Sequence, residues 1–304
     1  MTGLRAIVVG AAAGGGFPQW NCRGPVCARF WDGDPRVQAR TQSSLAVSVS
    51  GEDWLLLNCS PDIRQQIIQT PALQPRQTPR HTPIGAVLVT NGDIDHIAGL
   101  LTLREKQRFT LYGTASVLKA LKDNRVFDAL DPKFVSRKAI ELGATKELLP
   151  GLEVETFAVP GKVPLYLEEG EPDIGAEGEN TIGVRVSSKR TGSTLYYIPG
   201  CAHVPDSLFK RLRGASLLLF DGTLWQDDEM IQSGAGKKTG RRMGHISMSG
   251  PEGSIAAFAK AEIAQKIFVH INNTNPTLID DGPERRQAEE AGWEIAYDGM
   301  EISL

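Results

Sequence analysis

Several features that define other protein classes are scarce in this chain. It has four cysteines in 304 residues, too few for a disulfide framework, and this favours a reducing, cytoplasmic location. No run of about 18 apolar residues occurs, so no membrane segment is expected. Positive and negative side chains nearly balance at a net charge of −3, and no basic run alternates with aromatic residues. The sequence therefore gives no support for a nucleic-acid partner.

What the chain does contain is typical of a globular α/β protein. Hydrophobic residues make up 41% and charged residues 23%, which excludes disorder for most of the chain. Apolar runs bounded by turn residues predict strands at Leu4–Val9, Ser44–Val49, Trp54–Leu57, Ala86–Thr90, Phe109–Tyr112, Leu152–Val159, Thr181–Val186, Thr194–Ile198, Leu217–Phe220 and Ile267–His270. Helices are predicted at Asp62–Gln69, His96–Gln107, Ala115–Asp123, Asp206–Leu212, Gly253–Ala264 and Gly282–Ala291. Because strands come in runs with helices between them, we expect a layered α/β fold with mixed sheets in one domain, residues 1–304.

Two glycine-containing segments are expected to be loops. The first predicted strand is short, lacks the features of an export signal, and leads into Gly10–Gly16. No G-x-G-x-x-G pattern is present there, so a tight loop bordering the active site is favoured over a dinucleotide-binding loop. The acidic stretch Glu168–Glu179 is expected to be an exposed loop.

Two of the five histidines stand at the ends of predicted strands. His96 follows one strand and its loop, next to Asp95, and His270 closes another, while Asp221 follows a third. The carboxyl ends of strands are where α/β folds usually place ligands. Taken singly, each residue is more typical of a helix cap, a turn or a core position. Their recurrence in three segments favours a first-row metal site of the non-haem iron type.

The other three histidines differ in their surroundings. His245 lies in a Gly-rich, basic segment, Gly240–Ser247. It is interpreted as a proton donor, a base, an extra metal ligand or an ordinary surface residue, and the sequence leaves these alternatives open. His81 and His203 lack a strand-end position, and no functional role is assigned to them.

The segment Thr90–His96 resembles a reduced form of the His-x-His-x-Asp-His motif of the metallo-β-lactamase superfamily. Asp95 and His96 match its last two positions, whereas Asn91 and Asp93 replace its first two histidines. The similarity continues in chain order through segments that end near Cys59, Lys162, Asp221 and His270.

This resemblance implies that the two metal positions of the superfamily are affected differently. One position takes three histidines, and these are Asn91, Asp93 and Lys162 here. A lysine ammonium would repel a cation. The other position is complete as Asp95, His96, Asp221 and His270. We therefore expect one metal ion rather than two, which argues against a phosphodiesterase or lactonase with a dinuclear centre.

A closer and nearly end-to-end similarity exists to the pyrroloquinoline quinone (PQQ) biosynthesis protein B family. The stretches that carry it are Ala12–Cys22, Arg40–Ser44, Ser60–Gln66, Thr90–Glu105, Ile198–Ala202, Arg241–Gly250 and Val269–Pro276. The resemblance implies a metallo-β-lactamase-like αββα sandwich of two mixed sheets flanked by helices.

Two functions are attached to that family, and the resemblance implies both. The first is an oxygenase that uses one Fe(II) per chain and O₂ to hydroxylate the tyrosine-derived ring of the cross-linked Glu-Tyr precursor of PQQ. The second is a carrier that moves PQQ or its precursor towards the periplasm without catalysis. The single surviving site of two histidines and two carboxylates favours the hydroxylase. A homodimer remains an open alternative to a monomer.

The same resemblance suggests roles for residues around the metal. His245 and Lys162 are expected to handle protons or to anchor a phenolate or carboxylate. Arg241 and Arg242 are expected to bind the carboxylates of the substrate. Asn273 is the third substrate-binding candidate.

The cysteines form a separate question. Members of the family often carry Cys-x-Cys-x-x-Cys, a set suited to structural zinc. Here Cys22 and Cys27 remain, but Gly24 stands in the middle position. Either another ligand completes a zinc site, or zinc is weak or absent, and the sequence slightly favours the second. Cys59 and Cys201 are expected to be buried thiols.

Overall fold

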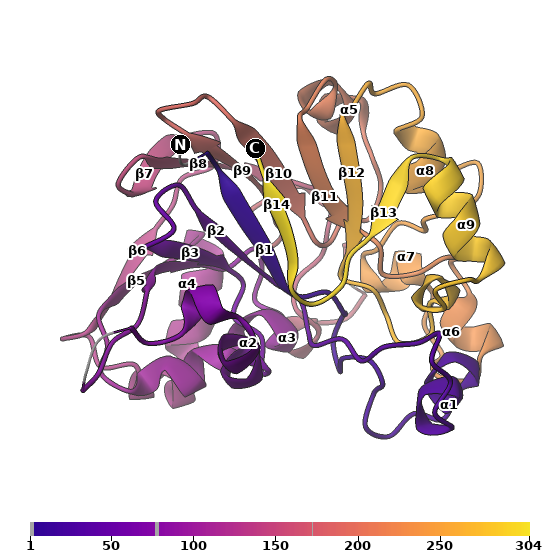
Figure 1. Ribbon diagram of the computed structural model, residues 1–304, viewed down its shortest axis with the longest axis horizontal. Helices are drawn as coiled ribbons and strands as arrows, with labels where there is room; N and C mark the ends of the chain where they lie inside the picture. Colours follow the sequence, from indigo (N-terminus) through magenta and orange to yellow (C-terminus); the bar gives the residue numbers. More distant parts are fainter. Residues whose placement is uncertain (1–2, 77–78, 172) are drawn as a thin grey trace.

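Two seven-stranded sheets face each other across a shared apolar core (Figure 1). The structure is a computed structural model that describes residues 3–76, 79–171 and 173–304. The strands of the first sheet are, in spatial order, β14 (Met300–Ser303), β1 (Arg5–Gly10), β2 (Ser44–Ser48), β3 (Trp54–Leu57), β4 (Ile84–Leu88), β5 (Phe109–Gly113) and β6 (Val135–Ala139). Those of the second are β13 (Trp293–Ile295), β12 (Gln265–Val269), β11 (Leu217–Asp221), β10 (Thr194–Ile198), β9 (Ile182–Ser188), β8 (Leu152–Ala158) and β7 (Thr145–Leu149).

Helices cover the outer face of each sheet, which completes the αββα arrangement. The helices that pack on the first sheet are α2 (Ile63–Gln69), α3 (Ile94–Ile97) and α4 (Ala115–Asp123), with the 3₁₀ segments η1 (Pro71–Leu73), η2 (Ala98–Arg104) and η3 (Arg125–Ala129). On the second sheet lie α1 (Pro25–Trp31), α5 (Asp206–Leu212), α8 (Ser254–Ala257), α9 (Pro283–Glu290) and η5 (Pro276–Leu278). The short elements η4 (Leu165–Leu167), α6 (Glu229–Gln232) and α7 (Gly240–Met243) belong to the loops that connect strands. The expected fold is thus confirmed.

Burial on both faces explains why the central strands are apolar almost throughout. In β1, Ala6 and Val8 point into the core between the sheets, whereas Ile7 and Val9 pack under the helices. Successive side chains of a strand alternate between its two faces. Because both faces are covered, a central strand needs apolar residues at nearly every position, which is the pattern visible in the sequence.

The four strands that sequence patterns did not predict are the edge strands of the two sheets. β6 and β14 end the first sheet, and β7 and β13 end the second. An edge strand has a neighbour on one side only, and it tolerates charged side chains, as Arg137 and Lys138 in the sequence VSRKA of β6. These strands form through pairing with a neighbour rather than through a strong local pattern.

Two helix predictions are too long. The segment predicted as one helix from His96 to Gln107 forms the four-residue α3 and then η2. The segment Gly253–Ala264 forms only α8 and an irregular continuation. Apolar spacing alone does not separate a long helix from a short one followed by 3₁₀ turns. None of the helices in the described residues is long and apolar enough to cross a membrane.

The connection after β4 brings the two sheets together at the candidate site. The Ile182 amide donates to the Thr90 carbonyl at 3.0 Å, and Asn91 forms an isolated bridge with Thr181. β10, β11 and β12 are parallel, so β11 and β12 deliver their carboxyl ends to the same edge. Residues that follow β4 therefore meet residues that follow β11 and β12.

Candidate metal centre

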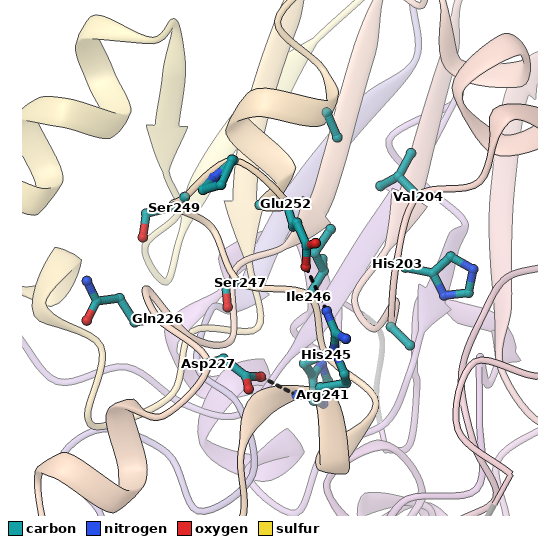
Figure 2. A pocket seen from close by; sticks show the side chains of 15 residues that line it. His203, Val204, Gln226, Asp227, Arg241, His245, Ile246, Ser247, Ser249 and Glu252 are labelled. Carbon is teal, nitrogen blue, oxygen red and sulfur yellow. Dashed lines mark hydrogen bonds and ion pairs between the residues drawn. The ribbon is translucent and has the colours of Figure 1, made fainter.

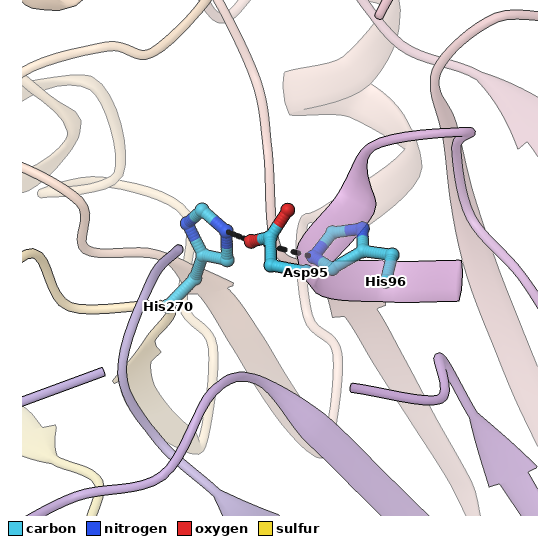
Figure 3. A group of neighbouring side chains, drawn as sticks. All are labelled: Asp95, His96 and His270. Atoms are coloured by element: carbon cyan, nitrogen blue, oxygen red, sulfur yellow. Dashed lines mark hydrogen bonds and ion pairs between the residues drawn. The ribbon is translucent and has the colours of Figure 1, made fainter. Parts of the chain in front are cut away.

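Asp95, His96 and His270 converge on one point, although they come from opposite sheets. His270 Nε2 lies 3.1 Å from Asp95 Oδ2, and His96 Nε2 lies 3.8 Å from the same oxygen. Figure 3 shows the carboxylate between the two rings. One ligand atom from each residue lies within 4.8 Å of the others. These three side chains form the first triad.

The loop after β3 holds the helix that carries Asp95 and His96. The Cys59 amide donates to the His96 carbonyl at 2.7 Å, and the Gly99 amide donates to the Cys59 carbonyl at 3.0 Å. A Cβ at Gly99 would lie 2.0 Å from the Ser60 carbonyl oxygen. This approach is open only to glycine, so Gly99 sets the distance between α3 and the loop.

Asn91 determines which nitrogen of His96 is available. Asn91 Oδ1 accepts from the Asp93 amide at 3.1 Å and lies 2.7 Å from His96 Nδ1. Because an amide oxygen can only accept hydrogen bonds, Nδ1 is the donor and carries the proton of the imidazole. His96 Nε2 then holds the lone pair, and it is buried with no hydrogen-bond partner. An orphaned acceptor beside a carboxylate fits a bound cation, so the residues present suit a metal ion.

A second triad consists of Asp221, His245 and His270, and it shares His270 with the first. His245 Nδ1 lies 2.8 Å from Asp221 Oδ2. The four ligands expected from the sequence are thus divided: Asp95 and His96 lie on one side of His270, and Asp221 lies with His245 on the other. His245 is the residue that the structure adds to Asp221.

Thr223 links the members of the second triad. Its hydroxyl donates to Asp221 Oδ1 at 2.6 Å. Having given its one proton, Thr223 Oγ1 accepts from His270 Nδ1, which is 2.8 Å away. His270 Nε2 therefore faces Asp95 with a lone pair, and two acceptors in such contact again fit a cation between or beside them. The sequence alone did not predict a role for Thr223.

Backbone geometry places Asp221 and His270. Asp221 is fully buried and accepts from the amides of Cys201 (2.9 Å) and Thr223 (3.0 Å), so its charge is compensated. His270 directly follows β12 and has a φ of 58°, a left-handed conformation that costs a non-glycine residue about 1 kcal/mol or more. The turn redirects the chain so that the ring faces Asp95.

Electrostatics keep the first triad in a form able to bind a metal ion. Burial lowers the pKa of His96 to about 4, so its imidazole is neutral near neutral pH. Burial alone would raise the pKa of Asp95, but the neighbouring His96 and His270 outweigh it and hold that pKa well below its usual range. A neutral imidazole at His96 and an ionised carboxylate at Asp95 are the protonation states that metal binding requires.

The pKa of His245 is shifted in the opposite direction from that of His96. Burial alone would lower its pKa, but the charge and hydrogen bond of Asp221 outweigh burial and raise it. Asp93 is also near: burial, and then the charge of Asp95, raise the pKa of its carboxyl. The second triad is therefore better suited to holding a proton than the first.

A cavity of about 600 Å³ opens above the first triad. Asp95, His245 and His270 are part of its wall, as are Asn91, Asp93 and Lys162, the residues that replace the histidines of the superfamily motif. The rest of the wall mixes apolar, neutral polar and cationic side chains. A ligand in this cavity would contact the metal ligands directly.

Two of the cations predicted to bind substrate, Lys162 and Arg242, form ion pairs with the same glutamate. Lys162 Nζ pairs with Glu168 at 3.0 Å, and Arg242 pairs with the same glutamate at 3.0 Å. The hydrogen bond from Arg242, followed by that from Lys162, lowers the pKa of Glu168 to about 2 despite opposing desolvation. Glu168, expected in an exposed loop, has a side chain only 8% exposed.

Arg241 and Asn273 do not line the cavity above the first triad. Arg241 lines a different cavity of about 690 Å³, where it lies between Asp227 and Glu252 (Figure 2). His245 lines both this cavity and the one above the first triad, so its ring lies between the two cavities. Asn273 is buried, and its amide lies 3.4 Å from Cys27 Sγ.

Cys22 and Cys27 lie near each other on and before α1. Cys22 Sγ accepts from the Gly24 amide at 3.3 Å. Burial raises the pKa of Cys27, which disfavours the thiolate. In the described ranges, no third histidine, cysteine, aspartate or glutamate joins this pair in a group able to hold a metal ion. Cys59 and Cys201 are buried, as expected.

Comparisons with known proteins identify related chains. Residues 53–271 match the family model of the beta-lactamase superfamily domain. The chain is 57% identical to coenzyme PQQ synthesis protein B of Methylobacterium nodulans over 99% of this chain and 100% of that protein. The corresponding protein of Rhizobium meliloti is 56% identical, over 99% and 98%.

Solved structures give the same relationship. Zn(2+)-bound PqqB from Methylobacterium extorquens has a TM-score of 0.97 at 56% identity, with 99% of this chain and 100% of that chain covered. A diphosphatase of the PhnP family has a TM-score of 0.71 at 21% identity, covering 99% and 97%. At that identity, the second likeness shows the fold alone.

Proposed function

Because the chain belongs to the coenzyme PQQ synthesis protein B family of the metallo-β-lactamase superfamily, we propose that it serves PQQ biosynthesis as an Fe(II)- and O₂-dependent hydroxylase. The substrate is the tyrosine-derived ring of the cross-linked Glu-Tyr precursor. The observation that carries the proposal is the unpartnered, buried Nε2 of His96 beside Asp95 and His270.

The ligand chemistry supports iron. Two imidazoles and one carboxylate on one side of a site, with positions left open, are the ligand set of non-haem Fe(II) oxygenases. The zinc in the M. extorquens protein supports a metal site in this chain without deciding the native metal. Bound to the first triad, Fe(II) would supply the activation of O₂ that ring hydroxylation needs. Asp221 is kept as the fourth candidate ligand, and we propose one iron per chain.

The other residues of the site have proposed roles that do not depend on direct metal binding. Ring hydroxylation inserts one atom of O₂ into a C–H bond, and the second leaves as water with two electrons and two protons from a reductant. Asp221 occupies Nδ1 of His245, so the remaining nitrogen can exchange a proton with a ring hydroxyl. Lys162 and Glu168 neutralise each other at the cavity wall and hold that wall in place.

Anaerobic reconstitution tests the proposal. Protein loaded with Fe(II) is mixed with the precursor, a reductant such as ascorbate, and O₂, and the product is analysed by mass spectrometry. We expect a ring that has gained oxygen, and no product with His96→Ala or His270→Ala. Full activity in both variants would show that the site is assigned wrongly.

The competing functions give different results in the same experiment. A carrier would bind PQQ tightly without metal and would consume no O₂ with any precursor. A dinuclear hydrolase would hold two equivalents of zinc per chain. Either outcome, with no hydroxylated product, would replace the oxygenase proposal.

A further inference from the structure

We propose that Lys237 and Lys238 are the residues that select an aromatic substrate carrying carboxylates. The inference rests on the proposed function, because it concerns the substrate of the same cavity. Both lysines line the cavity that contains Asp95 and His270. Lys237 is exposed and Lys238 is half-buried.

The first argument is that the other cations in this region already have carboxylate partners. Lys162 and Arg242 share Glu168, and Arg241 pairs with Glu252 beside the other cavity. In the part of the chain that the structure describes, neither Lys237 nor Lys238 forms an ion pair. Among the described residues that line the cavity, Lys237 and Lys238 are therefore the cations without a carboxylate partner, whereas the two arginines expected from the sequence are paired.

The second argument is that the backbone on either side of the lysines is anchored. The Gly236 amide donates to the Met230 carbonyl at 3.1 Å, which ties the segment to α6. On the other side, Thr239 caps α7 by accepting from the Arg242 amide at 3.2 Å. The two lysines thus occupy a two-residue span between fixed points, so less conformational entropy is lost when they bind an anion.

The third argument is the apolar part of the wall of the same cavity. Ile94, Leu165 and Tyr166 line the same cavity, and they are 57%, 59% and 41% exposed. Exposed apolar side chains next to a cavity are suited to covering an aromatic ring. Tyr166 is oriented by its hydroxyl, which donates to the Gly92 carbonyl at 3.0 Å.

These features define the ligand by its chemistry. The apolar wall fits a ring, the triad fits the ring oxygen, and the two ammonium groups fit carboxylates at the rim. A contact between an exposed lysine and a carboxylate is weak singly and is weakened further by salt. Loss of both lysines should therefore weaken binding by about tenfold.

Equilibrium binding tests the assignment without any turnover. PQQ, an aromatic tricarboxylate, and catechol, which has no carboxylate, are titrated into the full-length protein by calorimetry, with and without metal. The variant is Lys237→Gln/Lys238→Gln. The control is Lys210→Gln/Lys260→Gln, which removes the same charge from exposed positions outside this cavity.

We expect the Kd for PQQ to rise about tenfold in the first variant and not in the control, and its salt dependence to decrease. Binding of catechol should not change. An unchanged Kd for PQQ, an equal loss in the control, or no binding of PQQ to the wild type overturns the inference. Lysine-dependent binding in a protein that never hydroxylates the precursor would overturn the proposed function alone.

Discussion

Asn91 accepts the Nδ1–H of His96 at 2.7 Å, and this contact leaves Nε2 as the nitrogen that faces Asp95. In the superfamily motif, the position of Asn91 belongs to a metal-binding histidine. Here the side chain orients His96, a candidate ligand of the remaining metal position. Asn91 thus removes a ligand from one metal position of the superfamily and at the same time orients a candidate ligand of the other.

Replacement of Asn91 should therefore weaken metal binding although Asn91 is not a ligand. Asn91→Leu removes the acceptor for Nδ1–H, and outer contacts of this kind contribute about 10- to 100-fold in affinity. Fe(II) or Zn(II) affinity is measured by competition with a chelator. Asn91→Asp, which keeps an acceptor, is the control and should lose less. Equal affinity in Asn91→Leu and the wild type would contradict this role.

Thr223 should have a comparable effect on His270. Thr223→Val keeps the shape of the side chain but removes the oxygen that accepts from His270 Nδ1, so we expect metal affinity to fall about tenfold or more. Thr223→Ser retains the hydroxyl and should recover most of the affinity. If serine and valine behave alike, the hydroxyl does not orient the ring.

Gly99 should be intolerant of any side chain. A Cβ would lie 2.0 Å from the Ser60 carbonyl oxygen, so Gly99→Ala must move α3 or the loop after β3. We expect a loss of about 2 kcal/mol or more in the free energy of unfolding, with weaker metal binding. Gly178→Ala is the matched control, because nothing lies within 4 Å of its added Cβ. Similar denaturation midpoints for both variants would rule out the predicted clash.

Glu229 should make stability depend on pH. Its carboxylate accepts from Thr274 Oγ1 (2.6 Å) and the Trp225 amide (2.7 Å), yet burial outweighs these bonds and raises its pKa from 4.5 to about 7. The folded state thus binds the proton more tightly than the unfolded state. The stability that this proton contributes is complete below pH 4.5 and is lost as pH rises through 7, a change of up to about 3 kcal/mol.

Denaturation of Glu229→Gln and the wild type across this pH range measures the effect. The difference between the two free energies of unfolding should change with pH in the direction just given, because the amide does not titrate. The exposed Glu105→Gln is the control. A difference that is constant from pH 4.5 to 8 would contradict the raised pKa.

The positions of the candidate metal ligands could be predicted from the sequence because each lies at the end of a buried apolar strand or after it. The runs before Asp221 and His270 are buried throughout in β11 and largely in β12. The edge strands could not be predicted, because they are short, partly charged and dependent on a neighbour for pairing.

The contacts that orient the ligands were also beyond prediction from sequence. Thr223 contacts His270, 47 residues away, and only the folded chain shows which hydroxyl is near which ring nitrogen. Ion pairs are equally hard to predict. Arg242 was expected to bind an anionic substrate, but it pairs with Glu168, which lies 74 residues earlier in the chain. Pairing across such separations leaves no local pattern.

Anaerobic titration with Fe(II) tests the central claim most directly, with wild type and His96→Ala compared by equilibrium dialysis. The account predicts one equivalent of Fe(II) per chain in the wild type, and at least tenfold weaker binding in the variant, because removing a ligand costs about 1.4 kcal/mol or more. Two equivalents in the wild type, or one bound with unchanged affinity in His96→Ala, would contradict it.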